Sequence, residues 1–577
     1  MKLPAMNVIK RKSEGVNRFS GLDQRPKPYS SAFASMKNMT CERLPVMAAR
    51  KPRMRVRTLR HPGGIFAHGK LCFVENKGFF FDGVRKGDVL EGEKQFVRMG
   101  AYVLIWPDCA YYNTMTDEFG SLNRHNETAG LVTGALCNLN GGEYEYTTGE
   151  TAPQNPQNGQ YWMDTSQTPN VLKMWYATGG MWTSVPTVYT KISNPGIGKG
   201  LKPGDAVTLS GFIEATELNG MYTLTDCADN YIVVVALIQK AFEQRQTVVI
   251  DRKAPEMDYV TEAGNRVWGC SNARHELYAC ALGDPTNWTK YQGAASDSYA
   301  VTVGTAGDFT GAATHMNYPV FFKEDVVHQV MGNAPSNFAL TTNTCRGVAK
   351  GSAKSLVHVN EYLLYHAPLD VCIMGNSTLP STVSELLGKK AYANAIAGAS
   401  GSRYMMSAEN ETGQRELLVY DTQNNSWCRE DDAEVMQFAN ADGVLYMLYR
   451  NGEIWAVDGE APENLKDETA AAEKPVEWEL VTGPLGMDEA YSKWISGIQI
   501  HVACELGSAI RMDVAYNEDA EWREVFRLDP VKTRSLTIPL IPRRCRIMRI
   551  RLRGVGAFEL YLITKTIEQG SDVYAVD

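Results

Sequence analysis

The sequence predicts an all-β protein: a β-propeller of six or seven blades, with an inserted small β-barrel domain and a C-terminal β-sandwich. The 577 residues include 50 Gly, 27 Tyr, 18 Phe and 11 Trp, a supply of turn-forming and aromatic residues that is typical of β-rich proteins. Short apolar runs separated by turn residues recur about every 40 residues, which is close to the roughly 40 to 50 residues of a four-stranded propeller blade. Long period-2 alternation near the C-terminus predicts the sandwich.

The composition is that of a large folded protein. Hydrophobic residues make up 44% and charged residues 21% of the chain, which excludes global disorder. The formal net charge of -8 argues against a histone-like coat for nucleic acid. The first residues lack the apolar core of a signal peptide, and no run of about 18 apolar residues occurs, so we expect synthesis in the cytoplasm and no membrane insertion.

Residues 1–60 are predicted to be an extended N-terminal arm. They contain many Arg, Lys and Pro residues but little strand or helix periodicity, so the arm needs a partner to be ordered. Residues 61–145 are assigned to the first propeller blades. Within them, the segment LCFVENKGFFF (71–81) alternates, turns at ENKG and returns, which is the pattern of a β-hairpin.

The remaining domains follow from changes in the same pattern. A turn-rich segment followed by alternating positions such as Val207 and Leu209 predicts an inserted β domain. The predicted boundaries are 146–262 for this inserted domain, 263–459 for the remaining blades, 460–476 for a polar linker and 477–577 for the sandwich. Helix is scarce, and the best candidate is residues 381–396, with Ser381 or Thr382 as the cap and Gly398 as the stop.

No catalytic, cofactor or metal constellation is visible in the sequence, so the chain is predicted not to be an enzyme. His275 has no second His at the helical spacing of a zinc protease site. The triplet Glu430, Asp431 and Asp432 follows Trp427 and is interpreted as a solvated turn. The 12 Cys residues are spread singly and are interpreted as reduced, mostly buried thiols.

Two rows of arginines are the candidate functional residues. Arg53, Arg55 and Arg57 form one row, and Arg549, Arg551 and Arg553 form the other. In the second row the alternation predicts that Met548, Ile550 and Leu552 form a buried face. Each row offers guanidinium groups for a subunit contact or for passing DNA, and the alternative is an ordinary solvated strand face with local ion pairs. We expect a subunit contact, because strong phosphate pairing would hold DNA fast.

The N-terminal arm and the segment GGIFAHGKLCFVENKGFFFDG that follows it resemble the opening of nozzle or tail stabilisation proteins of short-tailed bacteriophages. In those proteins an arm with an Asn-apolar step, a Pro and a basic run leads into a β-propeller. The matching residues here are Met36, Asn38, Met39, Leu44, Pro45, Arg50 and Arg53. Lys37 and Leu44 depart from the commoner acidic or aromatic residues. The resemblance continues through HQVMGNAPSNFAL and IPRRCRIMRIRLRGVGAFELYLITKTIEQGSD.

The resemblance implies a structural protein of the virion tail. Such proteins form a ring, usually a hexamer, that extends the tail channel below the portal and adaptor and retains the genome until infection. The implied partners are other copies of the chain, adaptor or portal-side proteins, tail fibre or tail tip proteins, and genomic DNA that passes without sequence-specific binding. Two alternatives are a distal tail or baseplate component that contacts the host surface, with residues 146–262 as the binder, and a propeller enzyme acting on glycans.

Overall fold

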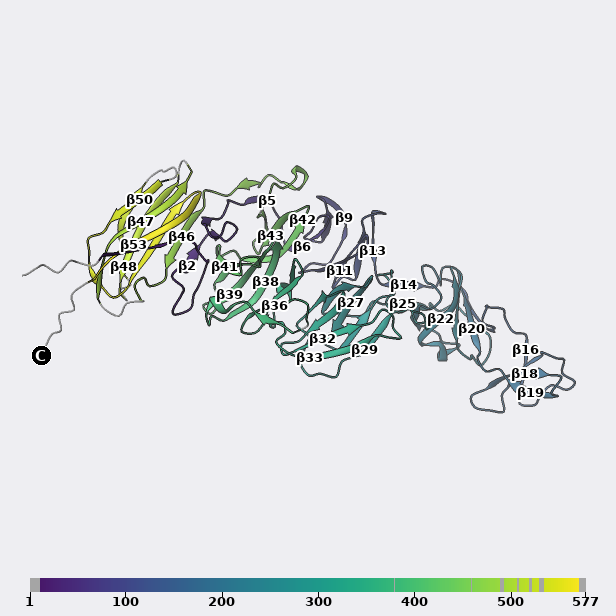
Figure 1. Ribbon diagram of the computed structural model, residues 1–577. Helices are drawn as coiled ribbons and strands as arrows, with labels where there is room; N and C mark the ends of the chain where they lie inside the picture. Colours follow the sequence, from purple (N-terminus) through teal and green to yellow (C-terminus); the bar gives the residue numbers. More distant parts are fainter. Residues whose placement is uncertain are drawn as a thin grey trace, which may run out of the picture.

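The protein is elongated and built from strands (Figure 1). The computed structural model describes residues 11–377, 379–457, 459–487, 492–505, 508–517, 521–528 and 534–569. A sandwich of sheets lies at one end, drawn mainly in yellow, the propeller lies in the middle, and the inserted sheets extend to the other end (Figure 1). The predicted all-β fold is confirmed. Among the described residues no helix has the length and apolarity to cross a membrane.

Six sheets of four consecutive antiparallel strands make up most of the propeller. Each strand pairs with the next along the chain, which is the arrangement of a propeller blade. The predicted hairpin at 71–81 is confirmed as the pair β7 and β8. The six sheets are β6 (Pro62–His68), β7 (Lys70–Glu75), β8 (Gly78–Phe81) and β9 (Val84–Asp88); β10 (Gln95–Met99), β11 (Tyr102–Trp106), β12 (Ala110–Asn113) and β13 (Glu118–Ser121); β26 (Tyr259–Ala263), β27 (Arg266–Ser271), β28 (Glu276–Ala279) and β29 (Tyr299–Thr302); β30 (Gly311–His315), β31 (Tyr318–Phe322), β32 (Val326–Met331) and β33 (Ala339–Thr344); β34 (Val357–Val359), β35 (Tyr362–His366), β36 (Val371–Met374) and β37 (Ser381–Thr382); β38 (Tyr392–Ser400), β39 (Arg403–Asn410), β40 (Arg415–Asp421) and β41 (Ser426–Arg429).

A seventh sheet closes the ring with a strand from the N-terminal arm. Its order is β42 (Val435–Ala441), β43 (Val444–Tyr449), β44 (Glu453–Ala456), β5 (Met54–Thr58) and β45 (Ala471–Ala472). The first strands of successive sheets touch: β6 contacts β10, β10 contacts β26, β26 contacts β30, β34 contacts β38, and β38 contacts β42, which returns to β6. The 3₁₀ helix η2 (Ala353–Ser355) contacts β30 and β38 where the circle passes β34. Because β5 comes from the arm, the two ends of the propeller are held in one sheet.

The inserted sheets extend away from the propeller. An eight-stranded sheet has the order β14 (Arg124–Glu127), β25 (Val249–Arg252), β21 (Ala206–Ser210), β22 (Gly220–Ala228), β23 (Tyr231–Val235), β20 (Tyr189–Ser193), β15 (Val132–Cys137) and β24 (Phe242–Gln244). It surrounds one apolar core that includes Val132, Ile192 and Ile250, and this gives the small barrel-like unit. The helix η1 (Thr216–Leu218) lies between β21 and β22. Beyond this unit lies a four-stranded sheet of β16 (Tyr146–Gly149), β17 (Tyr161–Asp164), β18 (Val171–Tyr176) and β19 (Met181–Ser184), here called the tip sheet.

The C-terminal sandwich is completed by strands of the N-terminal arm. One sheet has the order β2 (Phe33–Lys37), β46 (Glu477–Thr482), β52 (Met548–Val555), β48 (Ala509–Tyr516) and β49 (Arg523–Leu528). The other contains β3 (Met39–Thr40), β4 (Met47–Ala49), β53 (Phe558–Gln569), β47 (Lys493–Cys504) and β50 (Arg534–Pro539), with β1 (Arg11–Val16) on β53 and β51 (Arg544–Cys545) on β47. One apolar cluster runs from Ile550 of the sandwich through Met36 of the arm to Trp427 of the propeller. The arm is therefore a set of short strands packed within its own chain.

The predicted helix at 381–396 is wrong. The chain there forms β37, the three-residue 3₁₀ helix η3 (Glu385–Leu387) and the start of β38. The small residues of β38 admit a neighbouring blade, since a Cβ on Gly398 would lie 2.5 Å from the Cβ of Phe438 on β42. Close packing against a neighbouring strand therefore outweighs the local helix propensity of the alanines. A last 3₁₀ helix, η4 (Glu463–Leu465), precedes β45.

Candidate functional site: the junction of arm and propeller

The first arginine row lies where the arm enters the last propeller sheet. Arg55 and Arg57 are on β5, opposite Trp455 and Ile454 of β44, and Arg53 immediately precedes the strand. Arg55 forms an ion pair with Glu453 at 2.8 Å. The guanidinium of Arg57 stacks over Phe73, 4.4 Å from the ring centroid. Arg53 is 3% exposed, so this guanidinium is enclosed by its own chain.

Arg53 and Arg50 together bind three carboxylates, and both of them reach Asp431. Arg53 donates to Glu430, and to Asp431 at 2.6 Å. Arg50 binds Glu473 through both terminal nitrogens at 2.7 Å and reaches Asp431 at 3.2 Å. These partners come from three places: the arm, the segment after β41, and the linker before β46. We call this group of five residues the junction cluster.

The interpretation of the acidic triplet as a solvated turn is wrong for Glu430 and Asp431. Glu430 is 2% exposed, and the side chain of Asp431 is 18% exposed, whereas that of Asp432 is 53% exposed. The two carboxylates enter the protein because Arg53 and Arg50 compensate their charge. The sequence contains the basic run and the acidic run that form this cluster. They are about 380 residues apart, and no local pattern indicates that they pair.

Burial and charge act differently on the acids of the junction cluster. Burial raises the pKa of Glu430, and Arg53 does not fully offset this effect. For Asp431 burial also acts upward, but Arg53 and Arg50 outweigh it and lower the pKa. Burial opposes the charge of Arg53, yet Asp431 and Glu430 hold its pKa well above the ordinary value. Within the cluster the pKa of Glu430 is therefore shifted upward, whereas the pKa values of Asp431 and Glu473 are shifted downward.

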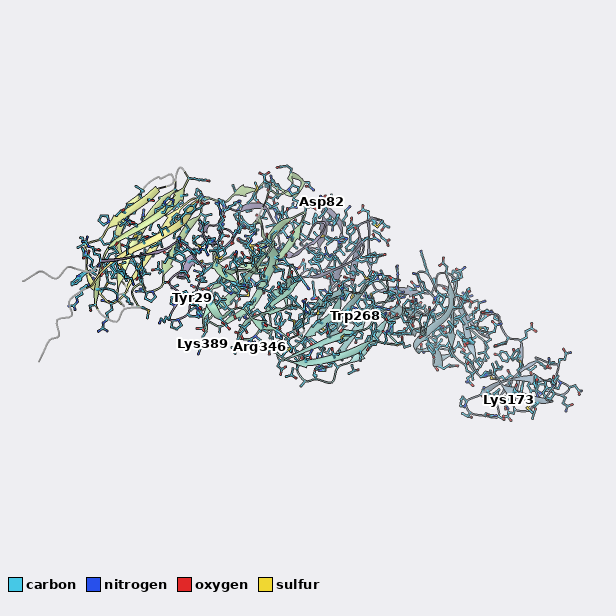
Figure 2. The ribbon with its side chains drawn as sticks, in the orientation of Figure 1. Tyr29, Asp82, Lys173, Trp268, Arg346 and Lys389 are labelled. Atoms are coloured by element: carbon cyan, nitrogen blue, oxygen red, sulfur yellow. A yellow bond between two sulfur atoms is a disulfide. The ribbon has the colours of Figure 1, made fainter. Side chains whose placement is uncertain are left out.

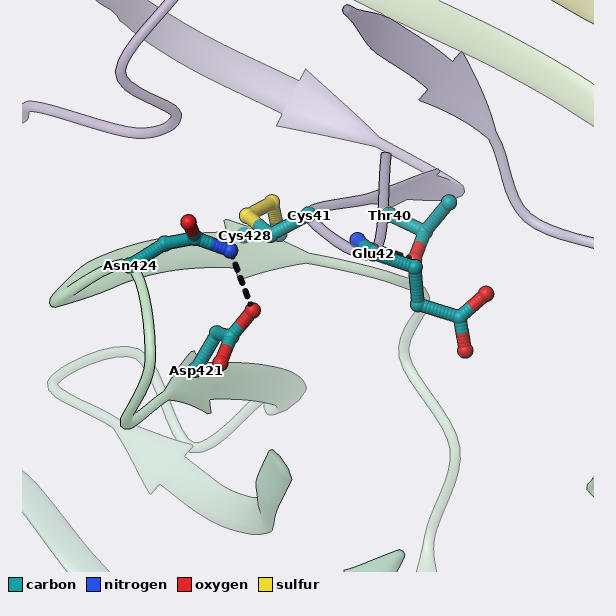
Figure 3. The surroundings of a disulfide bond; sticks show 6 residues. All are labelled: Thr40, Cys41, Glu42, Asp421, Asn424 and Cys428. Atoms are coloured by element: carbon teal, nitrogen blue, oxygen red, sulfur yellow. Dashed lines mark hydrogen bonds between the residues drawn. A yellow bond between two sulfur atoms is a disulfide. The ribbon is translucent and has the colours of Figure 1, made fainter. Parts of the chain in front are cut away.

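A disulfide joins the arm to β41, the propeller strand that directly precedes Glu430. Cys41, just after β3, is bonded to Cys428 on β41, across 387 residues of sequence (Figure 3). The Cα atoms are 6.0 Å apart, and Leu22 of the arm donates a backbone hydrogen bond to Trp427 at 2.7 Å. The interpretation of all cysteines as reduced is therefore wrong for this pair. Sequence spacing could not reveal it, because the two residues meet only in the folded chain.

The second arginine row lies on β52 of the sandwich. Met548, Ile550 and Leu552 are at most 1% exposed, so the predicted alternation is confirmed. On the opposite face, Arg551 and Arg553 bind the same carboxylate, Asp513 of β48, at 2.8 and 2.9 Å. The guanidiniums of Arg549 and Arg551 lie 5.5 and 4.7 Å from the centroid of Trp522. The two rows therefore belong to different units, the last propeller sheet and the sandwich.

The described residues contain no group of three or more His, Cys, Asp or Glu placed to hold a metal. His275, singled out by its HEL sequence, lies in a turn with a φ of 52° before β28. A narrow cleft beside the junction cluster is lined by Thr40, Glu42, Arg50, Lys51, Arg53, Arg403, Glu430 and Val457.

No protein-family model and no curated protein sequence matches the chain. Several solved structures are similar at low identity. Hsv2 of Kluyvelomyces marxianus is 10% identical, over 52% of this chain and 76% of that one, with a TM-score of 0.25. An exo-beta-1,3-galactanase from Phanerochaete chrysosporium is 8% identical, over 53% of this chain and 94% of that one, with a TM-score of 0.22. The phage phi92 endosialidase is 10% identical, over 77% of this chain and 71% of that one, with a TM-score of 0.23.

One sequence-based prediction is corrected by these comparisons. The chain was expected not to be an enzyme, but the proteins of similar structure include the galactanase and the endosialidase, which are enzymes. At these identities and TM-scores the likenesses assign no substrate or reaction to this chain.

Proposed function

We propose that the protein is a structural component of a bacteriophage tail, in which several copies form a ring that extends the tail channel. The observation that carries the proposal is the place of the residues that resemble nozzle and tail stabilisation proteins. Met36, Met39, Asn38, Arg50 and Arg53 are all less than 9% exposed, and they lie where arm, propeller and sandwich meet. The resemblance thus falls on residues that hold the architecture together.

The attachment of the arm suits a tail subunit that has to withstand force from adjoining tail proteins. The arm crosses from sandwich to propeller, and a disulfide, the junction cluster and strand β5 fix it at successive points. A net charge of -8 is compatible with DNA sliding past without being held, because strong phosphate binding needs a cationic surface. Ring formation, adaptor or portal-side partners, tail fibre or tip partners and a place in the virion are parts of this proposal.

Imaging of the purified full-length chain tests the proposal. We expect negative-stain micrographs to show rings with a central channel, and mass measurement to give six times the 63.9 kDa of the chain, in line with the resemblance. Cross-linking in intact virions should connect the chain to portal-side tail proteins. A chain that stays monomeric at high concentration, and that cross-links only to distal tail parts, would replace the ring with a component that contacts the host surface.

A further inference from the structure

The tip sheet lies at the free end of the molecule, opposite the sandwich, where Figure 2 labels Lys173. Its two faces differ. Met163 of β17 and Leu172 of β18 are directly opposite each other, and both belong to the core of the barrel-like unit. Since side chains alternate along a strand, their sequence neighbours point to the other face.

That other face carries three tryptophans. Trp175 of β18 is paired with Trp182 of β19, and Trp162 of β17 is paired with Lys173. The ring of Trp182 lies 5.5 Å from that of Trp175 and 5.4 Å from that of Trp162, at interplanar angles of 59° and 64°. Trp162 is 5% exposed, whereas Trp175 and Trp182 are partly exposed. Trp175 and Trp182 therefore present a partly exposed apolar surface on two adjacent strands, and the buried Trp162 packs against Trp182 from the third.

The surface is held rigidly by polar contacts. The indole nitrogen of Trp162 donates to the carbonyl of Gly149 at 3.0 Å. Lys173 forms an ion pair with Asp164 at 2.8 Å, and its ammonium lies 5.4 Å from the centroid of Trp162. Hydrogen bonds from Lys173 and Ser166 lower the pKa of Asp164 to about 2, so this pair stays charged at neutral pH. The backbone of Trp175 is tied to residues 159 and 160 of the preceding turn.

The charges along the segment that carries the tryptophans favour a neutral ligand over a polyanionic one. From residue 143 to residue 185 the chain has four carboxylates, Glu143, Glu145, Glu150 and Asp164, and one cation, Lys173, which Asp164 neutralises. Sites that stack nucleobases combine aromatic rings with a cationic groove for the phosphates, and that groove is lacking in this segment. A neutral sugar ring needs no cation, because its C–H face packs on an indole and its hydroxyls bond to polar groups at the rim, such as Ser184 and Thr147.

We propose that the tryptophan face of the tip sheet, formed by the partly exposed rings of Trp175 and Trp182 and supported by the buried Trp162, is a binding site for a neutral polysaccharide chain. This site goes beyond the proposed tail role and does not depend on it, because it lies within one copy of the chain.

Affinity electrophoresis of the full-length protein tests the site. The gels contain dextran, laminarin, galactomannan or arabinoxylan as neutral probes, and polysialic acid as a polyanion; single-stranded DNA is titrated in solution. We expect at least one neutral polymer to retard the protein and to shift its tryptophan fluorescence. Trp175→Ala and Trp182→Ala should each weaken that binding about tenfold or more, because an indole face is removed from the contact.

The matched control is Tyr176→Ala, which removes an exposed aromatic ring on the same strand but on the opposite face. It should leave binding unchanged. Trp175→Phe keeps a smaller ring in the same place and should retain part of the affinity, which separates lost stacking from a misfolded tip sheet. The proposal is overturned if no neutral polymer binds, if only the polyanions bind, or if binding persists unchanged when Trp175 and Trp182 are replaced together.

Discussion

The two arginine rows have the same sequence pattern but different surroundings. The guanidinium of Arg53 is enclosed with Glu430 and Asp431 at the junction of arm and propeller, whereas Arg551 and Arg553 are partly exposed and share the buried carboxylate of Asp513 in the sandwich. On β52 the alternation correctly indicates a face, whereas β5 pairs with β44 through a register shift and Arg53 lies before the strand. The depth at which Arg53 lies is set by segments hundreds of residues away, which local periodicity does not contain. A charge-alternating strand can therefore be either a structural clamp or a surface.

The largest effect is expected at Arg53. Arg53→Ala leaves Glu430 buried beside Asp431 without its cation, and breaking a buried pair in this way costs about 3 to 5 kcal/mol. Urea unfolding of the full-length chain measures the loss. Adding Glu430→Gln to Arg53→Ala should recover part of it, because the uncompensated charge is removed. Arg55→Ala is the control and should cost about 1 kcal/mol or less, since its partner Glu453 is partly exposed. If Arg53→Ala and Arg55→Ala lowered the free energy of unfolding equally, Arg53 would not be the more deeply buried of the two charges.

The next effect concerns the disulfide that holds the arm on the propeller. Cys41→Ser combined with Cys428→Ser is expected to lower the free energy of unfolding by about 2 to 4 kcal/mol, because the unfolded chain is no longer constrained. Free Cys72 is buried in the propeller, and Cys72→Ala serves as the control for removal of a thiol without a crosslink. Melting temperatures with and without reductant give the measurement. A wild-type chain that is insensitive to reductant would speak against the crosslink in solution.

Two acids of the junction cluster, Glu430 and Asp431, should contribute to stability with opposite dependence on pH. The pKa of Glu430 is raised in the folded state, so wild-type stability falls as pH rises from about 4.3 towards that folded value. Glu430→Gln removes this loss, and its stability relative to wild type should grow over the same window. The pKa of Asp431 is lowered, so its contribution is present above about 3.9 and is lost as pH falls through the folded value.

Accordingly, Asp431→Asn should be less stable than wild type at pH 7, and the gap should close in acid. Urea unfolding at a series of pH values from 3 to 8 measures both differences. Asp432→Asn, on the exposed neighbour, is the control and should follow wild type closely. Two parallel curves for the Glu430 and Asp431 variants would show that both acids lie in equivalent surroundings.

The sequence was informative wherever neighbours along the chain form the structure. The hairpin at β7 and β8 and the buried side of β52 follow directly from alternation. Sequence-based prediction failed where the contacting segment is distant in the sequence. The arm looked irregular because β3 and β4 have only two and three residues and take their order from β53 of the sandwich. Cys41 and Cys428 are likewise brought together only by the docking of the arm.

The smallest effect on folding is expected at Arg551. This residue also gives the sharpest test of the difference between the two arginine rows. Arg551→Ala should lower the free energy of unfolding by about 1 kcal/mol or less, because Arg551 is partly exposed and Arg553 still neutralises the buried Asp513. Under the proposed ring, a guanidinium on this face meets a carboxylate of a neighbouring copy, and truncating a desolvated pair there costs about 2 to 5 kcal/mol. Charge reversal, Arg551→Glu, should therefore reduce ring assembly far more than it reduces folding, as measured by light scattering beside urea unfolding.

Arg60→Glu, at an exposed arginine between β5 and β6, is the control and should assemble normally. Normal assembly of Arg551→Glu with altered genome ejection would instead place this row against DNA.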